Sequence, residues 1–174
     1  MSGLSAGRGR VVYTIGYSGL TLESLVAVLV RLGVELVVDV RRFPRSRVPG
    51  FSRPELEKAL GEKGVEYRWM GALGALGIRY ESRFRCVDSP TFNSYVNYLV
   101  FSEEARSALR ELAGLASERK TALLCRERDP RFCHRQFIAD YLAHLGFTVV
   151  HVVGGSTRGH EPTPCYAYLS VGPG

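Results

Sequence analysis

Five short, largely apolar runs punctuate the chain and predict buried strands at residues 11–15, 36–40, 65–70, 121–124 and 148–153. The second and fourth runs are apolar almost throughout, which is typical of parallel strands that are covered on both faces. Between the runs, apolar residues recur at helical spacing, as at positions 22, 25, 26, 29 and 32. This alternation predicts the α/β class, with a mostly parallel sheet of about five strands and helices on both faces.

The 174 residues suit one domain, and we place it at residues 11–153. Residues 1–10 are rich in glycine, serine and arginine and predict a disordered N-terminal segment, whereas residues 154–174 read as a Gly/Pro-rich C-terminal tail. No apolar run approaches the roughly 18 residues of a membrane helix, and the N-terminus lacks the apolar core of a signal peptide. The sequence therefore predicts a cytoplasmic protein with no membrane partner.

The formal net charge of +6 comes from 20 arginines and only 3 lysines, set against 17 acidic residues. Arginine suits carboxylate and phosphate recognition because its donors form a rigid fork. The same bias also fits a heat-adapted source, so charge alone does not establish a nucleic-acid partner. Arginines interleave with aromatic residues at 79–85, a pattern that suits either single-stranded nucleic acid or an ordinary surface loop.

The chemistry concentrates in residues 121–145, which predict a strand, a charged loop and a helix. The strand ends at Cys125, and Cys133, His134 and Arg135 are expected in the first turn of the helix, where free backbone N–H groups favour anions. Two thiols, an imidazole and a guanidinium thus converge near one strand end.

Further polar residues follow the other predicted strands: Ser18 after the first, and Asp39, Arg41 and Ser46 at or after the second. The carboxyl ends of parallel strands meet at one edge of a sheet, so we expect these residues to share one pocket with Cys125. Asp39 must be paired or hydrogen-bonded there, and both a pairing with a neighbouring arginine and a direct catalytic role remain open.

Four motifs, TIGYSG (14–19), VVDVRRFPRS (37–46), YRWMGALG (from 67) and LLCRERDPRFCHR (123–135), resemble the domain-of-unknown-function 488 family in their order along the chain. The resemblance covers about residues 11–153. It implies a shared pocket, built here from Ser18, Asp39, Arg41, Pro44, Ser46, Cys125, Glu127, Cys133, His134 and Arg135. Tyr17 stands where the family pattern places a histidine.

Two functions follow as hypotheses. The first is an enzyme, a Cys- or His-dependent hydrolase or transferase, acting on a phosphate-bearing substrate such as a nucleotide or nucleic acid. Its expected catalytic residues are Cys125, His134 and Asp39, and its expected substrate-binding residues are Ser18, Arg41, Ser46, Glu127, Cys133 and Arg135, with both arginines as anion clamps. The alternative is a non-catalytic nucleic-acid-binding module in which the Cys/His/Arg cluster only stabilises a loop.

Four cysteines are too few to predict a disulfide scaffold in a chain of this size, although a pair oxidises readily in a hyperthermophile. The role of Cys125 remains open: it is a nucleophile, a structural thiol, a metal ligand or a disulfide partner. Adjacent Cys133 and His134 would point to different sides of a helix, an arrangement that disfavours joint ligation. We therefore predict no metal site and no cofactor.

Overall fold

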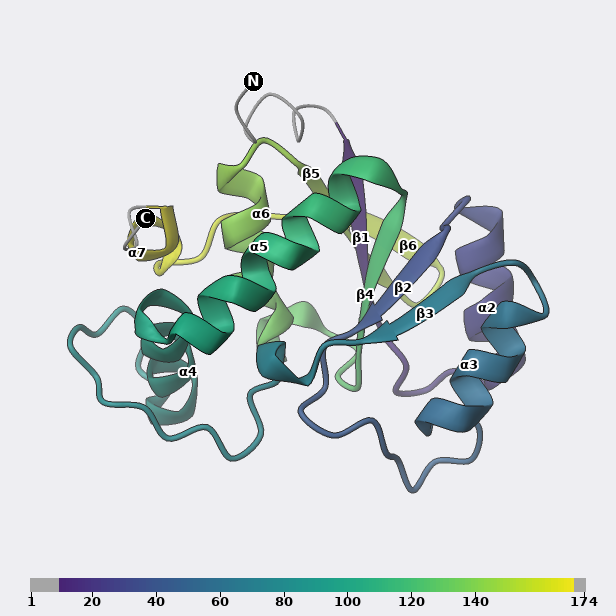
Figure 1. Ribbon diagram of the computed structural model, residues 1–174, viewed down its shortest axis with the longest axis horizontal. Coiled ribbons are helices and arrows are strands. Elements are labelled where there is room, and N and C mark those ends of the chain that lie inside the picture. The colour runs from purple at the N-terminus through teal and green to yellow at the C-terminus, as the bar shows by residue number, and fades with distance from the viewer. Residues whose placement is uncertain (1–9, 171–174) are drawn as a thin grey trace.

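A six-stranded sheet runs through the computed structural model, which describes residues 10–170 (Figure 1). Its strands are β1 (Val11–Gly16), β2 (Leu36–Asp39), β3 (Glu66–Trp69), β4 (Thr121–Cys125), β5 (Thr148–Val153) and β6 (Ser156–Gly159). They follow the order β3-β2-β4-β1-β5-β6, and β6 alone is antiparallel to its neighbour. The predicted α/β class and mostly parallel sheet are confirmed, with one strand more than the five expected. Residues 1–9 of the predicted disordered segment lie outside the described part.

Helices cover both faces of the sheet. On one face lie α2 (Leu22–Arg31) and α3 (Arg53–Gly61), and on the other lie α4 (Pro90–Phe101), α5 (Glu103–Glu118), α6 (Arg135–His144) and the short α7 (Tyr166–Ser170) (Figure 1). Two 3-10 turns, η1 (Gly71–Leu73) and η2 (Pro130–Phe132), lie close to the carboxyl edge of the sheet.

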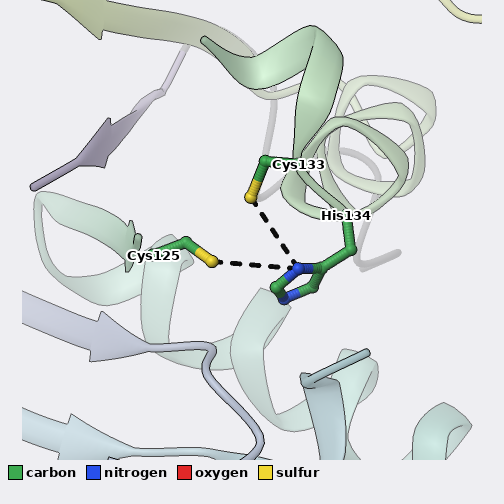
Figure 2. Close-up of side chains that lie close together, drawn as sticks. All are labelled: Cys125, Cys133 and His134. Carbon is green, nitrogen blue, oxygen red and sulfur yellow. Dashed lines mark hydrogen bonds between the residues drawn. The ribbon is translucent and has the colours of Figure 1, made fainter. Parts of the chain in front are cut away.

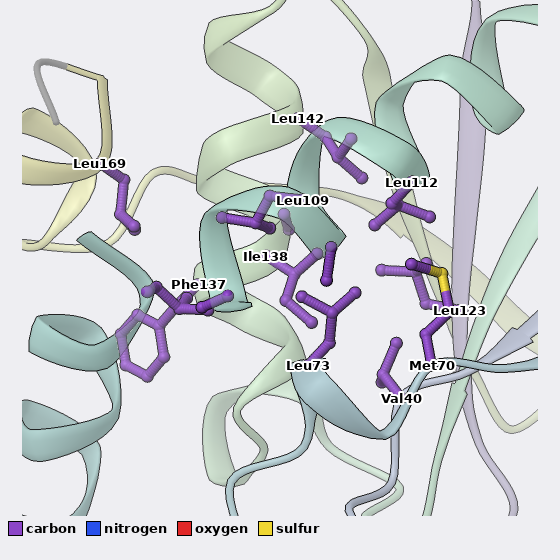
Figure 3. Packing of buried hydrophobic residues seen from close by; sticks show 14 of the residues in the cluster. Val40, Met70, Leu73, Leu109, Leu112, Leu123, Phe137, Ile138, Leu142 and Leu169 are labelled. Carbon is purple, nitrogen blue, oxygen red and sulfur yellow. The ribbon is translucent and has the colours of Figure 1, made fainter. Parts of the chain in front are cut away.

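Strand periodicity decides which face each side chain joins. In β4, Leu123 and Cys125 pack with the α4–α7 layer, whereas Ala122 and Leu124 pack with α2 and α3. Figure 3 shows Leu123 among the buried side chains of the first layer, which include Ile138 from α6. Each such buried leucine contributes about 1.5–3 kcal/mol relative to an exposed one. Because of this alternation, the side chain of Cys125 faces α6.

The segment predicted as a tail is structured as far as residue 170. It begins with a turn at Gly154 (φ +61°) and forms β6 on the edge of the sheet, while α7 packs against α6 and buries Leu169. A disulfide joins Cys165 to Cys86, two cysteines that the sequence did not pair. All four residues of β6 are exposed, so the edge strand lacks the apolar pattern that revealed the other five.

The parallel register brings the ends of β1, β2 and β4 together. Gly16 is the partner of Cys125, and Asp39 is the partner of Leu124. Gly16 has a steric reason to be glycine, because a Cβ there would overlap the carbonyl oxygen of Glu127 in the loop that passes over it. Among the described residues, no helix has the length and apolar character needed to cross a membrane.

Candidate functional site

A pocket of about 340 Å³ opens at the carboxyl edge of the sheet. Loops after β1, β2 and β4, the segment after η1 and the start of α4 contribute to its wall. We call it the carboxyl-edge pocket; its lining comprises Tyr17, Arg41, Arg42, Phe43, Arg45, residues 75–77, Thr91, Phe92, residues 125–127, Phe132 and His134. Its position matches the strand edge at which open α/β sheets bind their ligands.

Cys125, Cys133 and His134 meet at the base of this pocket, and we call them the thiol–histidine cluster. The Nδ1 atom of His134 lies 3.8 Å from Sγ of Cys125 and 3.7 Å from Sγ of Cys133 (Figure 2). All three residues are buried, with 3%, 1% and 7% of Cys125, Cys133 and His134 exposed. The expected convergence of these three side chains is therefore present, and Cys125 and His134 are the two that line the pocket.

The position of α6 explains why neighbouring Cys133 and His134 point the same way. The helix begins at Arg135, and His134 is its N-cap, while Cys133 is still extended (φ −131°, ψ 144°) after η2. We expected both residues inside the helix, where joint ligation is disfavoured, and that expectation is wrong. Residues 130–132 form the separate turn η2, so Cys133 lies between that turn and the helix.

The imidazole of His134 is held on two sides. Its Nε2 lies 2.8 Å from the backbone oxygen of Val40, which can only accept, so Nε2 carries a proton and donates it. The ring also packs edge-to-face against Tyr95 at a centroid distance of 5.2 Å. Nδ1 is therefore aimed at the two sulfur atoms by rigid neighbours.

The pKa values of the two thiols are shifted in opposite directions. The hydrogen bond to Cys133 and burial raise the pKa of Cys125 well above its usual value. Burial would also raise the pKa of Cys133, but the hydrogen bond from Cys125 and the charge of His134 outweigh it and hold that pKa well below normal. Burial opposes the charged form of His134, yet the neighbouring Cys133 thiolate raises its pKa. A thiolate–imidazolium pair is thus favoured behind a neutral thiol that faces the pocket.

Arg135 and Arg41 were expected to bind an anion, but in the structure both guanidinium groups donate to acceptors inside the protein. Arg135 is fully buried and donates to Thr14 Oγ1, the Glu127 carbonyl and the Arg128 carbonyl at 2.6–3.0 Å. Arg41 forms a two-pronged ion pair with Asp39 and also donates to the carbonyl oxygen of Phe51. Their donors are directed into the protein; Arg41 forms part of the pocket wall, whereas Arg135 is not among the lining residues.

Asp39 is fully buried and accepts hydrogen bonds from Arg41 and from the hydroxyl of Tyr67. Its role is structural, since the Nε2–H of His134 donates to the Val40 carbonyl oxygen and not to this carboxylate. Of the two alternatives for Asp39, the geometry favours the pairing that fixes the loop after β2.

The remaining expected residues divide between the pocket and its surroundings. Glu127 lines the pocket. Ser18 is exposed outside the lining, with its backbone N–H bonded to the Arg126 carbonyl. Ser46 stabilises a turn, because its hydroxyl accepts from the N–H of Val48.

Several lining residues were not among the expected catalytic or substrate-binding residues, although Arg45 was expected at the pocket mouth. Arg45 lies over the ring of Phe43 at 5.5 Å, and Arg126 approaches Glu127 only at 3.9 Å. Among residues 10–170, neither guanidinium donates a hydrogen bond to a protein acceptor. Three exposed apolar side chains also border the pocket: Phe43 (48% exposed), Leu76 (71%) and Phe132 (69%). Sequence signals placed these residues in basic loops but could not distinguish free arginines from braced ones.

Tyr17, at the position where the resemblance led us to expect a histidine, is buried in the pocket wall. Its ring stacks on Phe51 at 4.4 Å, and the Arg41 guanidinium lies 5.4 Å from its centroid. At this position the chain therefore has an aromatic ring that packs against Arg41.

Comparison with known proteins gives one informative result. No curated protein and no solved structure matches the chain. A family model does match over residues 21–142, which include the motifs at 37–46 and 123–135 that surround the pocket. That model is described as "Domain of unknown function DUF488", and because the match spans more than half of the chain, the protein belongs to this family.

Proposed function

We propose that this protein is an enzyme that acts on a phosphate-bearing substrate, a nucleotide or a nucleic acid, in the carboxyl-edge pocket. The observation that supports the proposal is that a thiol and an imidazole at the floor of the pocket are surrounded by arginine side chains. Cys125 and His134 lie at the base, while Arg42, Arg45 and Arg126 lie around it. These residue types support a Cys- or His-dependent hydrolase or transferase.

The charge of the rim favours an anion. Arg41 is neutralised by Asp39, which leaves three arginines against the single carboxylate of Glu127 among the lining residues. Arg45 and Arg126 retain their donors for a ligand, and guanidinium groups match the oxygens of a phosphate in two-pronged contacts.

The apolar part of the rim favours a ligand with a planar ring. Phe43 and Phe132 are both exposed at the mouth, and exposed apolar side chains grouped around a pocket are typical of ligand-binding grooves. A volume of about 340 Å³ lies within the usual range of small-molecule pockets, roughly 300–1,000 Å³. A nucleotide offers both a phosphate for the arginines and a base that stacks on the rings.

Binding is tested first, through the fluorescence of Trp69. It is the only tryptophan in the chain, and its indole N–H donates to the Arg41 carbonyl oxygen in the pocket wall. We expect AMP to quench it at lower concentration than inorganic phosphate does. We expect Arg45→Gln and Arg126→Gln each to weaken AMP about 10–100-fold, since a charge-assisted hydrogen bond contributes roughly 1.5–3 kcal/mol. Arg110→Gln, in the exposed pair with Glu103, is the matched control.

Turnover is tested next, with nucleotides and short oligonucleotides and product detection by mass spectrometry. Cys125→Ser and His134→Gln are expected to abolish turnover while AMP binding persists. Failure of both AMP and an oligonucleotide to bind, or wild-type binding by both arginine variants, would refute the proposed substrate class.

A non-catalytic nucleic-acid-binding module is the second candidate, and one observation favours it. A second hollow, lined by Arg79 and Tyr80, adjoins the carboxyl-edge pocket and shares Gly77 and Thr91 with it, so a longer chain has a path across both. The neighbouring Arg83 and Phe84 are engaged in packing, against Phe101 and Tyr168. Steeply salt-dependent oligonucleotide binding without turnover would favour this module over the enzyme.

A further inference from the structure

The thiol–histidine cluster has the spacing of a metal site. In tetrahedral coordination, Zn–S bonds of about 2.3 Å and Zn–N bonds of about 2.0–2.1 Å place sulfur and nitrogen ligands about 3.6 Å apart. The two distances from Nδ1 of His134 to the sulfurs are 3.8 Å and 3.7 Å, and all three atoms lie within 4.8 Å of one another. Shifts of a few tenths of an ångström would bring both nitrogen–sulfur distances to this tetrahedral value.

The histidine is oriented as a ligand. Its Nε2–H donates to the Val40 carbonyl at 2.8 Å, so Nδ1 is the nitrogen that coordinates once the ion displaces its proton. A hydrogen bond from the second ring nitrogen to a backbone carbonyl is the usual support for a metal-bound imidazole. Tyr95 packs against the ring and blocks its rotation.

The ligands are also held by separate, rigid parts of the fold. Cys125 ends β4, where its carbonyl oxygen accepts from Tyr17, and Cys133 closes η2 with a hydrogen bond from its N–H to the Pro130 carbonyl. His134 caps α6. Three elements thus deliver one ligand each without any need for the loop between them to fold around an ion (Figure 2).

We propose that the thiol–histidine cluster binds one Zn²⁺ ion through Cys125 Sγ, Cys133 Sγ and His134 Nδ1. Thiolate and imidazole ligands select zinc over hard cations such as Mg²⁺, and two thiolates balance its charge. Within residues 10–170, the cluster comprises these three ligands, and two of them line the carboxyl-edge pocket. Three protein ligands with a fourth position open to a pocket are the arrangement of catalytic rather than structural zinc.

The use of this ion in catalysis rests on the proposed function, since its open position would receive water or a phosphoryl oxygen of the substrate. With the ion bound, Cys125 and His134 would serve that reaction as its ligands and not as the nucleophile and the acid–base group. Binding of the ion does not rest on the proposed function, because the three side chains hold their geometry independently of any substrate. The two proposals can therefore fail separately.

The test uses the full chain, prepared anaerobically and freed of metal with a chelator that leaves the Cys86–Cys165 disulfide intact. Zn²⁺ is titrated in competition with a chromophoric chelator, and Co²⁺ is added separately as a spectroscopic substitute. We expect one Zn²⁺ per chain, intense tetrahedral cobalt bands and a thiolate-to-cobalt charge-transfer band. The cobalt spectrum requires no variant, so it tests the site even where a substitution disturbs folding.

Variants locate the ion. Cys133→Ser and His134→Gln should each weaken Zn²⁺ more than about 100-fold, because loss of an outer hydrogen-bonding partner alone costs roughly 10–100-fold. His144→Gln, which changes a histidine at the other end of α6, should bind as the wild type does. Circular dichroism confirms that each variant is folded.

The absence of thiolate-to-cobalt charge transfer in the wild type, or zinc affinity unchanged by Cys133→Ser, would overturn the metal site. AMP binding to the metal-free protein is measured alongside. Intact AMP binding without zinc binding would discard the metal alone, and zinc binding without binding of either AMP or an oligonucleotide would discard the proposed substrate alone.

Discussion

The disulfide between Cys86 and Cys165 gives a prediction whose magnitude follows from its place in the chain. It closes a loop with a sequence separation of 79 residues and ties the segment before α4 to α7. In the chain-entropy description, a loop of this length reduces the entropy of the unfolded chain by about 15 cal/mol/K, or about 4.5 kcal/mol at 25 °C. Typical domains have a free energy of unfolding of only about 5–15 kcal/mol, so the bond contributes a large share.

The perturbation is the double variant Cys86→Ala/Cys165→Ala, compared with the oxidised wild type by urea unfolding at pH 7. We expect a loss of about 4 kcal/mol, and a similar loss when reductant is added to the wild type. Reductant should leave the double variant unchanged, which is the control for effects on Cys125 and Cys133.

Alkylation of the unfolded, unreduced wild type should label Cys125 and Cys133 only. Labelling of all four cysteines, or a stability difference below about 1 kcal/mol with the bond intact, would refute the reasoning.

Three further predictions concern the frame of the site. Gly16→Ala should lower the free energy of unfolding by about 1–3 kcal/mol and reduce ligand binding, because the new Cβ overlaps the loop after β4; an unchanged urea midpoint would contradict this. Asp39→Asn should cost about 3–5 kcal/mol because it leaves Arg41 buried without its counter-charge, whereas Glu57→Gln in an exposed pair should cost no more than about 1 kcal/mol. Equal losses in these two variants would show that the buried pair is not special. Burial lowers the pKa of His151 to about 3. Between the ordinary histidine pKa of about 6.5 and pH 3, the unfolded chain therefore binds one proton more than the folded chain does. The free energy of unfolding should fall by up to about 1.36 kcal/mol per pH unit as the pH is lowered through this range. His151→Gln should remove that part of the slope in urea titrations across this range, and an unaltered slope would exclude His151 as its source.

Local pattern was sufficient for most of the fold. The runs at 36–40 and 121–124 are apolar on both faces, and only a covered parallel strand accommodates that pattern, so the class and the layers followed from it. The edge strand β6 escaped because all its residues are exposed. The pairing of Cys86 with Cys165 was not predicted because it depends on where α7 packs, and no local sequence pattern shows that these two cysteines lie close together.

The sequence by itself determined which loops meet at the carboxyl edge, because parallel strands with crossover connections leave their loops on one side. It therefore placed Cys125, Cys133 and His134 together. Only the tertiary structure decided which guanidinium groups form their hydrogen bonds inside the protein. As residue types, Arg135 and Arg41 suit anion binding, yet they donate to buried carbonyl oxygens and, for Arg41, to Asp39. The tertiary structure also decided the directions of neighbouring side chains. One 3-10 turn before α6 moves Cys133 out of the helix and aims its sulfur at the imidazole, because side-chain direction depends on the backbone conformation at each residue rather than on spacing along the chain.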